Sequence, residues 1–290
     1  MLIAQSEITA LIHLVDDPDK RIYNHVKDKI LAYGSEAVPF LETAWISSAQ
    51  NKVLQSRLED IVRAIQYNEV VKKLQIWKEE GGESLLEGFV LVSRYMHPDI
   101  SYDHIKRYLD KIKQDIWLEL SPNLTAFEKI KVFNKVFFDI YGFKGNGKDY
   151  HSPRNSFINT VLESKKGNPL SLSMIYMMIA LELDIPLKGI NLPNHFVLGY
   201  LDASLSKVAG IEDSDIVFYI NPYNRGAMLM NSDVEKFLTE LKLPLKDEFM
   251  MPCSNKEMIS RMISNLINAY RLMKDEQKTE ELKTLRAMFL

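Results

Sequence analysis

The sequence predicts an α+β protein that is mainly helical, with one small antiparallel sheet in its second half. Apolar residues recur at helical spacing from about residue 6 to residue 141. A mainly apolar stretch, 170–183, is shorter than the roughly 20 residues of a membrane span and is expected to form a buried helix. Short runs rich in β-favouring side chains follow at 189–192, 195–201 and 216–220. Three strands after a buried helix point to an α+β domain.

The first 81 residues are expected to form an N-terminal helical region. The segment Asp16-Asp17-Pro18-Asp19 ends one helix and begins another, which Gly34 ends. A short helix over 36–45 and one or two long helices over 51–80 follow. The residues expected to face inward are Ile22, Val26, Ile30, Leu31, Val38, Leu41 and Trp45. The pattern resembles a HEAT-type repeat, and a helical bundle explains it equally well.

A second region, 82–252, is expected after the boundary at Gly81-Gly82. It opens with helices over 85–95, 103–118 and 125–141. In the third of these helices the inward residues are expected to be Phe133, Val136, Phe137 and Ile140.

A glycine-rich segment, 142–147, is predicted to be a structural turn. A phosphate-binding loop needs a strand before it and a helix after it, whereas here a helix precedes and a Tyr-His-Ser-Pro loop follows. The next short helix is expected over 155–163, with Asn155 or Ser156 as its N-cap.

The last region, 253–290, is predicted to be a docked helical hairpin. The residues Ser254-Asn255-Lys256-Glu257 fit a capping box at the start of its first helix. The helix pattern breaks near 274–279 and resumes to the end, which resembles a single tetratricopeptide-type unit.

The composition bounds the possible functions. The formal net charge is −3, so the chain has no long-range basic field, and a nucleic-acid partner is not expected. The single cysteine, Cys253, cannot form an intramolecular disulfide, and the first residues lack the cationic start and cleavage site of a secretory signal. A cytoplasmic protein without a membrane partner is therefore expected.

Three positions follow the chain order of a cysteine-type acyl-transfer site. Such a site needs a thiolate at a helix N-terminus, a histidine base and an acid or amide that orients the histidine. In this chain the helix start at Pro169, the predicted strand residue His195 and the strand end at Asn221 stand at these three places. The position of the nucleophile is occupied by a proline, which has no nucleophilic atom but suits the first turn of a helix.

The segment that begins Arg154-Asn155-Ser156 and continues through Lys166-Gly167-Asn168-Pro169 to Pro193-Asn194-His195 resembles the bacterial SirB-type branch of the transglutaminase-like superfamily. The resemblance covers about 85–229. It implies a papain-like core in which a buried helix packs on a small antiparallel sheet. Active members of the superfamily carry cysteine where this chain has Pro169, and an Asp-Pro pair where it has Asn221-Pro222. Asparagine serves as the orienting residue in papain-like enzymes, so Asn221 alone is compatible with chemistry.

Two serines near Pro169 are alternative nucleophiles. Ser173 lies four residues on, on nearly the same helix face, whereas Ser171 is rotated by about 200° from Pro169. The other explanation is that both are buried structural serines, because serine within an apolar helix commonly bonds to its own backbone. Cys253 precedes a capping serine and is expected to be a packing residue.

His195 has three interpretations: a vestigial base, a working base or binding group, and an ordinary buried histidine. The candidate residues for a polar cleft around it are Asn155, Asn168, Asn194 and Tyr223. For Asn168 and Asn194 a role in a cap or turn is the preferred explanation. The acidic segment 202–215 is expected to form a loop at the rim of the site. No paired histidine spacing indicates a metal, and no cofactor is expected.

The sequence therefore predicts a noncatalytic transglutaminase-like protein that acts as a binding or regulatory module, with a protein or peptide as its partner. Two features carry this prediction: Pro169 at the nucleophile position and the repeat-like helices that can present a binding surface. The alternative is a hydrolase or acyltransferase that uses Ser173 or Ser171 with His195 and Asn221. The oligomeric state is left open by the sequence.

Overall fold

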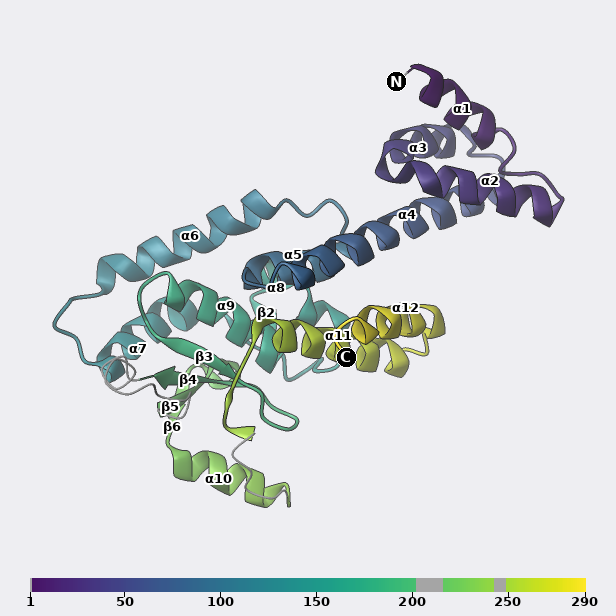
Figure 1. Cartoon of the computed structure of the whole chain (residues 1–290). Coiled ribbons are helices and arrows are strands. Elements are labelled where there is room, and N and C mark those ends of the chain that lie inside the picture. Colours follow the sequence, from purple (N-terminus) through teal and green to yellow (C-terminus); the bar gives the residue numbers. More distant parts are fainter. Residues whose placement is uncertain (1, 202–215, 243–248) are drawn as a thin grey trace. The chain divides into compact units, whose positions relative to one another are not determined.

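The computed structural model of the chain describes residues 2–201, 216–242 and 249–290, with side chains from residue 6 onward (Figure 1). The chain forms two compact units, one of residues 1–76 with 94–98 and one of 77–93 with 99–290. The C-terminal helices thus share a unit with the sheet. The division into 1–81, 82–252 and 253–290 stays a prediction.

Helices make up the first unit, as the apolar periodicity predicts. They are α1 (Leu2–Ile12), α2 (Lys20–Tyr33), the 3₁₀ helix η1 (Gly34–Ala37), α3 (Val38–Ser47) and α4 (Lys52–Glu79), whose last residues enter the second unit. Asp19 begins α2 by accepting the backbone N–H of Arg21, and Gly34 ends it with φ of 58°. The long segment after residue 51 is one helix.

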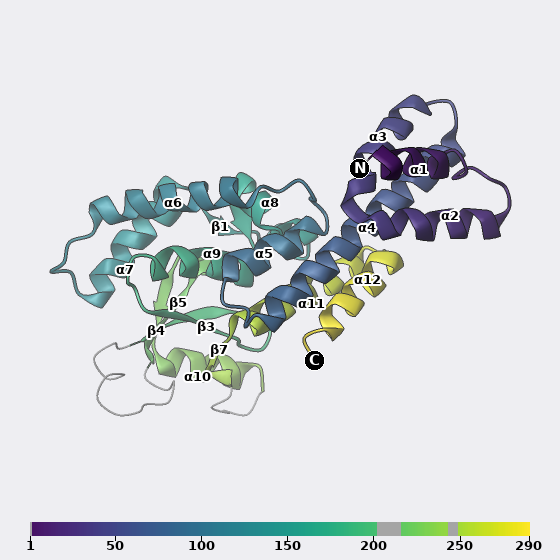
Figure 2. The same ribbon diagram turned by 45° about the horizontal axis from the view of Figure 1, so that its top comes forward.

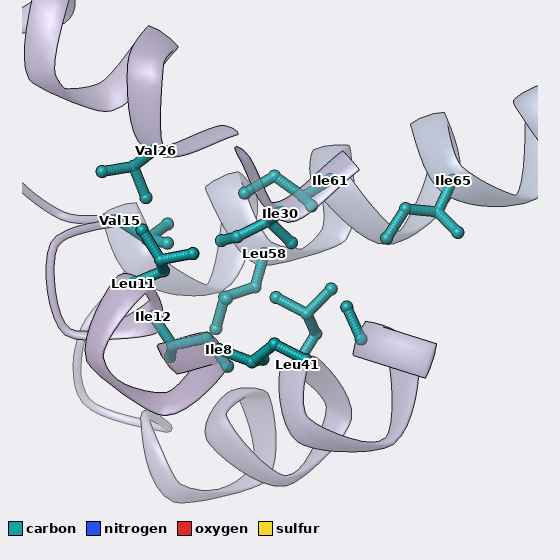
Figure 3. Packing of buried hydrophobic residues seen from close by; sticks show 11 residues of the cluster. Ile8, Leu11, Ile12, Val15, Val26, Ile30, Leu41, Leu58, Ile61 and Ile65 are labelled. Atoms are coloured by element: carbon teal, nitrogen blue, oxygen red, sulfur yellow. The ribbon is translucent and has the colours of Figure 1, made fainter. Parts of the chain in front are cut away.

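The core of this unit is aliphatic, and its side chains converge from all four α-helices (Figure 3). Its central members are Ile8, Leu11, Ile12, Val15, Val26, Ile30, Leu41, Leu58, Ile61 and Ile65. Two predicted inward residues are wrong: Ile22 is 41% exposed and Trp45 is 40% exposed. Ile22 lies in the first turn of α2, beyond the core, and Trp45 places its indole N–H on Glu59 Oε1, 2.8 Å away.

The second unit begins with helices that surround one buried helix. Their bounds are α5 (Leu85–Arg94), α6 (Tyr102–Glu119), α7 (Ala126–Asn134), the π-helix η2 (Lys135–Ile140), the 3₁₀ helix η3 (Pro153–Ser156), α8 (Ile158–Ser164), α9 (Pro169–Leu181), the 3₁₀ helix η4 (Pro222–Asn224), α10 (Asn231–Glu240), α11 (Asn255–Leu272) and α12 (Glu276–Ala287). The capping box predicted at Ser254 is confirmed at the start of α11.

The helix predicted over 125–141 is divided into α7 and the π-helix η2. A π-turn closes hydrogen bonds over five residues and so rotates the following side chains out of the α-helical pattern. Phe133, Val136 and Phe137 are buried as expected, but Ile140 is 62% exposed, so its predicted burial is wrong.

Asn155 and Ser156 do not cap α8. Both lie in η3, and the N-cap position of α8 is Phe157, which makes no side-chain cap. The Asn155 amide instead donates to the backbone oxygens of Asp149 and Tyr150, at 2.7 and 3.0 Å, and so stabilises the loop before it.

The sheet has five strands in the order β6-β5-β4-β3-β7, and every neighbouring pair is antiparallel. Its strands are β3 (Leu187–Ile190), β4 (Val197–Leu201), β5 (Ile216–Asn221), β6 (Ala227–Leu229) and β7 (Pro252–Cys253). The helix α9 lies on one face of the sheet and α10 on the other (Figure 2). The edge strands β6 and β7 have only three and two residues, too few for alternation to show in the sequence.

The glycine-rich segment after η2 also differs from a simple turn. It contains β1 (Lys144–Gly145), which pairs in parallel with β2 (Lys166–Gly167) directly before α9. This pairing places the segment beside the start of the buried helix.

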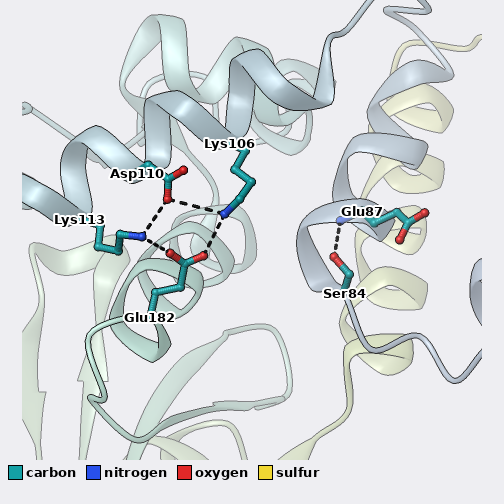
Figure 4. A network of polar contacts seen from close by, with 6 residues as sticks. All are labelled: Ser84, Glu87, Lys106, Asp110, Lys113 and Glu182. Atoms are coloured by element: carbon teal, nitrogen blue, oxygen red, sulfur yellow. Dashed lines mark hydrogen bonds and ion pairs between the residues drawn. The ribbon is translucent and has the colours of Figure 1, made fainter.

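A charged network joins α6 to the end of α9 (Figure 4). Lys113 Nζ lies 2.9 Å from Asp110 Oδ1 and 2.6 Å from Glu182 Oε2. Lys106 contacts the same two carboxylates at 3.6 and 3.4 Å. All four side chains are partly exposed, so we expect solvent to screen these pairs and their stabilisation to be small.

Across the described ranges, no helix has both the length and the apolar character that a membrane span requires.

Candidate functional site

The first turn of α9 is fixed by a reciprocal cap. The Ser171 N–H donates to Asn168 Oδ1 at 2.8 Å, and the Asn168 N–H donates to Ser171 Oγ at 3.1 Å. Pro169 occupies the first helical position, where no N–H is needed. Asn168 is thus a cap residue, as preferred from the sequence, and its amide also donates to Ser156 Oγ at 2.9 Å.

His195 lies in the connection between β3 and β4, two residues before β4 begins at Val197. The predicted strand over 195–201 therefore starts too early, because Pro193 and Asn194 form a turn in which Asn194 has φ of 59°. The pairing of Leu198 with Ile220 brings the start of β4 beside the end of β5, where Asn221 stands. The side chain of Asn221 lies close enough to His195 to affect the pKa of its imidazole.

Aromatic rings flank the imidazole of His195. The ring centroid of Tyr223 lies 6.4 Å away and that of Phe237 5.8 Å away. Gly145 makes room for Tyr223, because a Cβ at this glycine would collide with the phenol ring.

The surroundings of His195 lower the pKa of its imidazole. Burial is the main cause, and the positive charge of Arg261 adds to it, whereas the side chain of Asn221 acts in the opposite direction. The imidazole is therefore neutral at neutral pH.

His195 opens into a polar cleft of about 600 Å³. The first turn of α9 lines it with Asn168, Pro169 and Leu170, and Asn194 lies at its edge next to His195. The structure thus brings together four of the residues predicted for the site. Asn155 is only 2% exposed and Tyr223 stands beside His195, but neither lines the cleft. The predicted rim loop, 202–215, lies outside the described residues.

The helix α11 supplies a second wall of the cleft, which sequence reasoning missed. Its contributing residues include Arg261, Ser264, Asn265, Asn268 and Leu272. The other four lie three, four, seven and eleven positions after Arg261, so all five share one face of the helix. The sequence contains this mainly polar stripe but does not show which element it faces. In the structure, α11 packs against η3 and α9.

Neither serine of α9 lines the cleft. The Ser171 hydroxyl is held in the cap with Asn168. Ser173 is fully buried, and its Oγ has no hydrogen-bond partner within the described residues. A nucleophile must reach both a base and its substrate, and these two positions give no support to a serine mechanism.

Ser173→Ala is expected to leave the free energy of unfolding unchanged or to raise it, by up to about 1 kcal/mol, because it removes a buried unpaired hydroxyl. Ser93→Ala is the matched control. The Ser93 hydroxyl donates to Phe89 O at 2.8 Å and accepts from the Ile158 N–H at 3.0 Å. Its loss is expected to cost about 1–3 kcal/mol. Urea unfolding measures both, and an equal cost for the two variants would contradict the assignment.

His195 is expected to make stability depend on pH. Its pKa in the folded protein lies below the reference value of 6.5, so the unfolded chain binds the proton more tightly. The stabilisation is complete above about pH 6.5 and is lost as the pH falls through the folded-state pKa. Urea unfolding between pH 7.5 and 5 should show a smaller pH slope for His195→Gln than for the wild type. The control is His104→Gln, which exchanges an exposed histidine; an unaltered slope in His195→Gln would refute the expectation.

The thiol of Cys253 is poorly suited to act as a nucleophile. Burial raises the pKa of the Cys253 thiol to about 12, which keeps it protonated and poorly nucleophilic. In the part of the chain that the structure describes, no three His, Cys, Asp or Glu side chains are grouped so that they could hold a metal ion.

The sequence of the chain is similar to those of known proteins. The family profile described as "Transglutaminase-like superfamily" matches residues 103–264. F-box only protein 21 of Homo sapiens is 27% identical over 225 residues, which are 67% of this chain and 35% of that protein. The UPF0162 protein of Vibrio cholerae is 26% identical over 202 residues, covering 69% of this chain and 70% of the relative.

A further relative is protein SirB1 of Salmonella typhimurium, 23% identical over 207 residues, which are 70% of this chain and 72% of SirB1. The chain therefore spans about a third of the length of F-box only protein 21 and most of the length of these two bacterial relatives. No solved structure matches the chain.

Proposed function

The chain belongs to the transglutaminase-like superfamily, and on this basis we propose that it is a noncatalytic member, a binding or regulatory module whose cleft holds a peptide segment of a partner protein. The observation that carries the proposal is Pro169, which stands at the first position of α9 and lines the cleft. A pyrrolidine ring can pack against a ligand, but it offers no atom for covalent catalysis.

The remainder of the site supports binding. Asn221 remains close to His195, and an open cleft of about 600 Å³ lies beside the imidazole, within the size range of ligand sites. Its wall carries the side-chain amides of Asn194, Asn265 and Asn268. Each amide both donates and accepts, which suits the N–H and C=O groups of an extended peptide.

Peptide selection tests the proposal. A random 12-residue peptide library displayed on phage is panned against the full chain, and recovered peptides are titrated by calorimetry. Asn265→Trp is designed to fill the cleft, because Asn265 is a lining residue on α11. Lys283→Trp, on the exposed face of α12, is the matched control.

Recovered peptides are expected to bind the wild type and Lys283→Trp alike and to lose at least about tenfold in affinity for Asn265→Trp. Equal binding to both tryptophan variants would place the peptides outside the cleft and contradict the proposal. A serine-reactive fluorophosphonate that labels Ser171 or Ser173 in the folded protein would contradict the noncatalytic assignment.

A further inference from the structure

The cleft carries positive charge without acidic residues. Arg261 and Arg271 both line it. Its lining, taken over the described residues, contains no aspartate and no glutamate. The chain as a whole has a formal net charge of −3, so the cationic character is local.

In the described part of the chain, Arg261 is held by neutral groups: two oxygen acceptors and the ring of Phe196, whose centroid lies 5.9 Å from the guanidinium carbon. Its Nη1 donates to Leu192 O at 2.7 Å and to the side-chain oxygen of Asn191. Within the described ranges no carboxylate forms an ion pair with it, and Nη2 and Nε have no hydrogen-bond partner. Two contacts to one nitrogen orient the guanidinium and leave its other donors for a ligand.

Partial burial makes this arrangement costly in the absence of an anion. Arg261 is half-buried, and desolvation lowers its pKa, which agrees with a charge that is partly removed from water. The nearby thiol of Cys253 stays protonated and cannot balance the charge. Buried charges in proteins are normally paired, because the desolvation penalty is otherwise not offset.

We infer that the cleft binds an acidic peptide segment, with Arg261 receiving a carboxylate of that segment and Arg271 lying at the rim. The planar guanidinium fork matches a carboxylate through two parallel N–H···O bonds. The N-terminal end of α9 lines the same cleft, and its partial positive charge favours an anion as well. This inference rests on the proposed function and adds the chemical class of the peptide.

A different explanation is that Arg261 only clamps the turn before β4, through Leu192 and Asn191. A clamp needs no free donors and no acid-free cleft. An exposed arginine of the same cleft distinguishes the two explanations. Among the described residues, the Arg271 side chain donates only to Asn268 of its own helix, at 3.1 Å, so it holds no other segment in place there.

The peptide selection described above provides the test. Peptides recovered on the full chain should be enriched in aspartate and glutamate over the unselected library. Replacing the critical acidic residue of a recovered peptide by its amide should weaken binding to the wild type about tenfold or more. Arg261→Gln should remove this preference and Arg271→Gln should reduce it, whereas Arg286→Gln, on the exposed face of α12, should preserve it.

Each other outcome has a defined meaning. Peptides recovered without acidic enrichment, or bound equally in their acid and amide forms, overturn this inference and leave the proposed function intact. Failure to recover any cleft-dependent peptide overturns both. Competition by 10 mM inorganic phosphate but not by 10 mM acetate overturns the carboxylate assignment in favour of a phosphate. If Arg261→Gln and Arg271→Gln both keep the preference for the acidic peptide over its amide form, neither arginine binds the peptide, and the inference is overturned.

Discussion

Gly226→Ala is expected to destabilise the second unit by about 3 kcal/mol, the sum of backbone strain and collision. Gly226 has φ of 69°, and a Cβ there would overlap the side-chain amide of Asn134. That amide is part of a buried relay. Tyr176 OH donates to Asn134 Oδ1 at 2.9 Å, and Asn134 Nδ2 donates to Gly226 O at 2.9 Å.

The relay joins the buried helix α9 to the turn that carries Asn221. The Gly226 N–H donates to Asn221 O at 2.9 Å, so displacing this turn also displaces the partner of His195. The fully buried Tyr176 has its only hydroxyl partner in Asn134, among the described residues. A substitution at Gly226 is therefore expected to leave a buried polar group unsatisfied, which adds to the cost.

Gly142→Ala is the control that separates backbone strain from steric collision. Gly142 has φ of 78°, but a Cβ there would meet no atom within 4 Å. Gly142→Ala should therefore lower the free energy of unfolding by the backbone strain alone, about 1–2 kcal/mol. Urea unfolding followed by circular dichroism measures each variant. Combining Gly226→Ala with Asn134→Ala should reduce the additional cost of the glycine substitution to that of Gly142→Ala. Equal costs for the two single glycine variants would contradict the collision.

Pro169→Cys is expected to yield a thiol that ionises readily, with its alkylation by iodoacetamide at pH 6.5 about tenfold faster than that of Ser264→Cys. Position 169 lies at the N-terminal end of α9, where the helix dipole favours a thiolate, whereas position 264 lies within α11 on the opposite wall of the same cleft. The neutral His195 is available to accept the thiol proton.

Mass spectrometry of the alkylated protein measures the rate across pH. The native thiol of Cys253, with a pKa of about 12, is expected to give little background. Adding His195→Gln to Pro169→Cys should raise the apparent pKa of the introduced thiol. Equal rates for the two cysteine variants, with no effect of His195→Gln, would mean that the cleft no longer favours a thiolate. The expected result would instead show that the proline is the principal block to nucleophile formation.

Local chemistry explains why several features were predictable. Asp19 and Ser254 begin helices and Gly34 ends one. These helix ends depend on hydrogen bonds to residues two or three positions away, and the structure confirms each of them. The cap at Asn168 and the proline after it are equally local. Register within an element was less predictable, because the π-turn of η2 turns Ile140 outward without a distinct sequence signal.

The candidate site could be predicted only in part, because the burial of its side chains depends on packing between elements that are distant in sequence. The order of Pro169, His195 and Asn221 along the chain indicated that they would meet, and the pairing of β4 with β5 brings the segments that carry the last two side by side. Whether the two serines of α9 line the cleft or are buried depends on which side of this helix faces the sheet and which side faces the cleft. That orientation is set by packing with elements distant in sequence, so from the sequence a buried Ser173 was one of two explanations, and the structure supports it.

The sequence by itself determined the fold class, the family resemblance and the absence of a cysteine at the start of α9, because each of these depends on residue identity and short-range periodicity. Only the tertiary structure decided what encloses the cleft. Arg261 and its helix α11 lie far along the chain from Pro169, yet they form the opposite wall. Periodicity shows that a helix has a polar face but not which neighbour that face meets, since this is fixed by the packing of the whole unit.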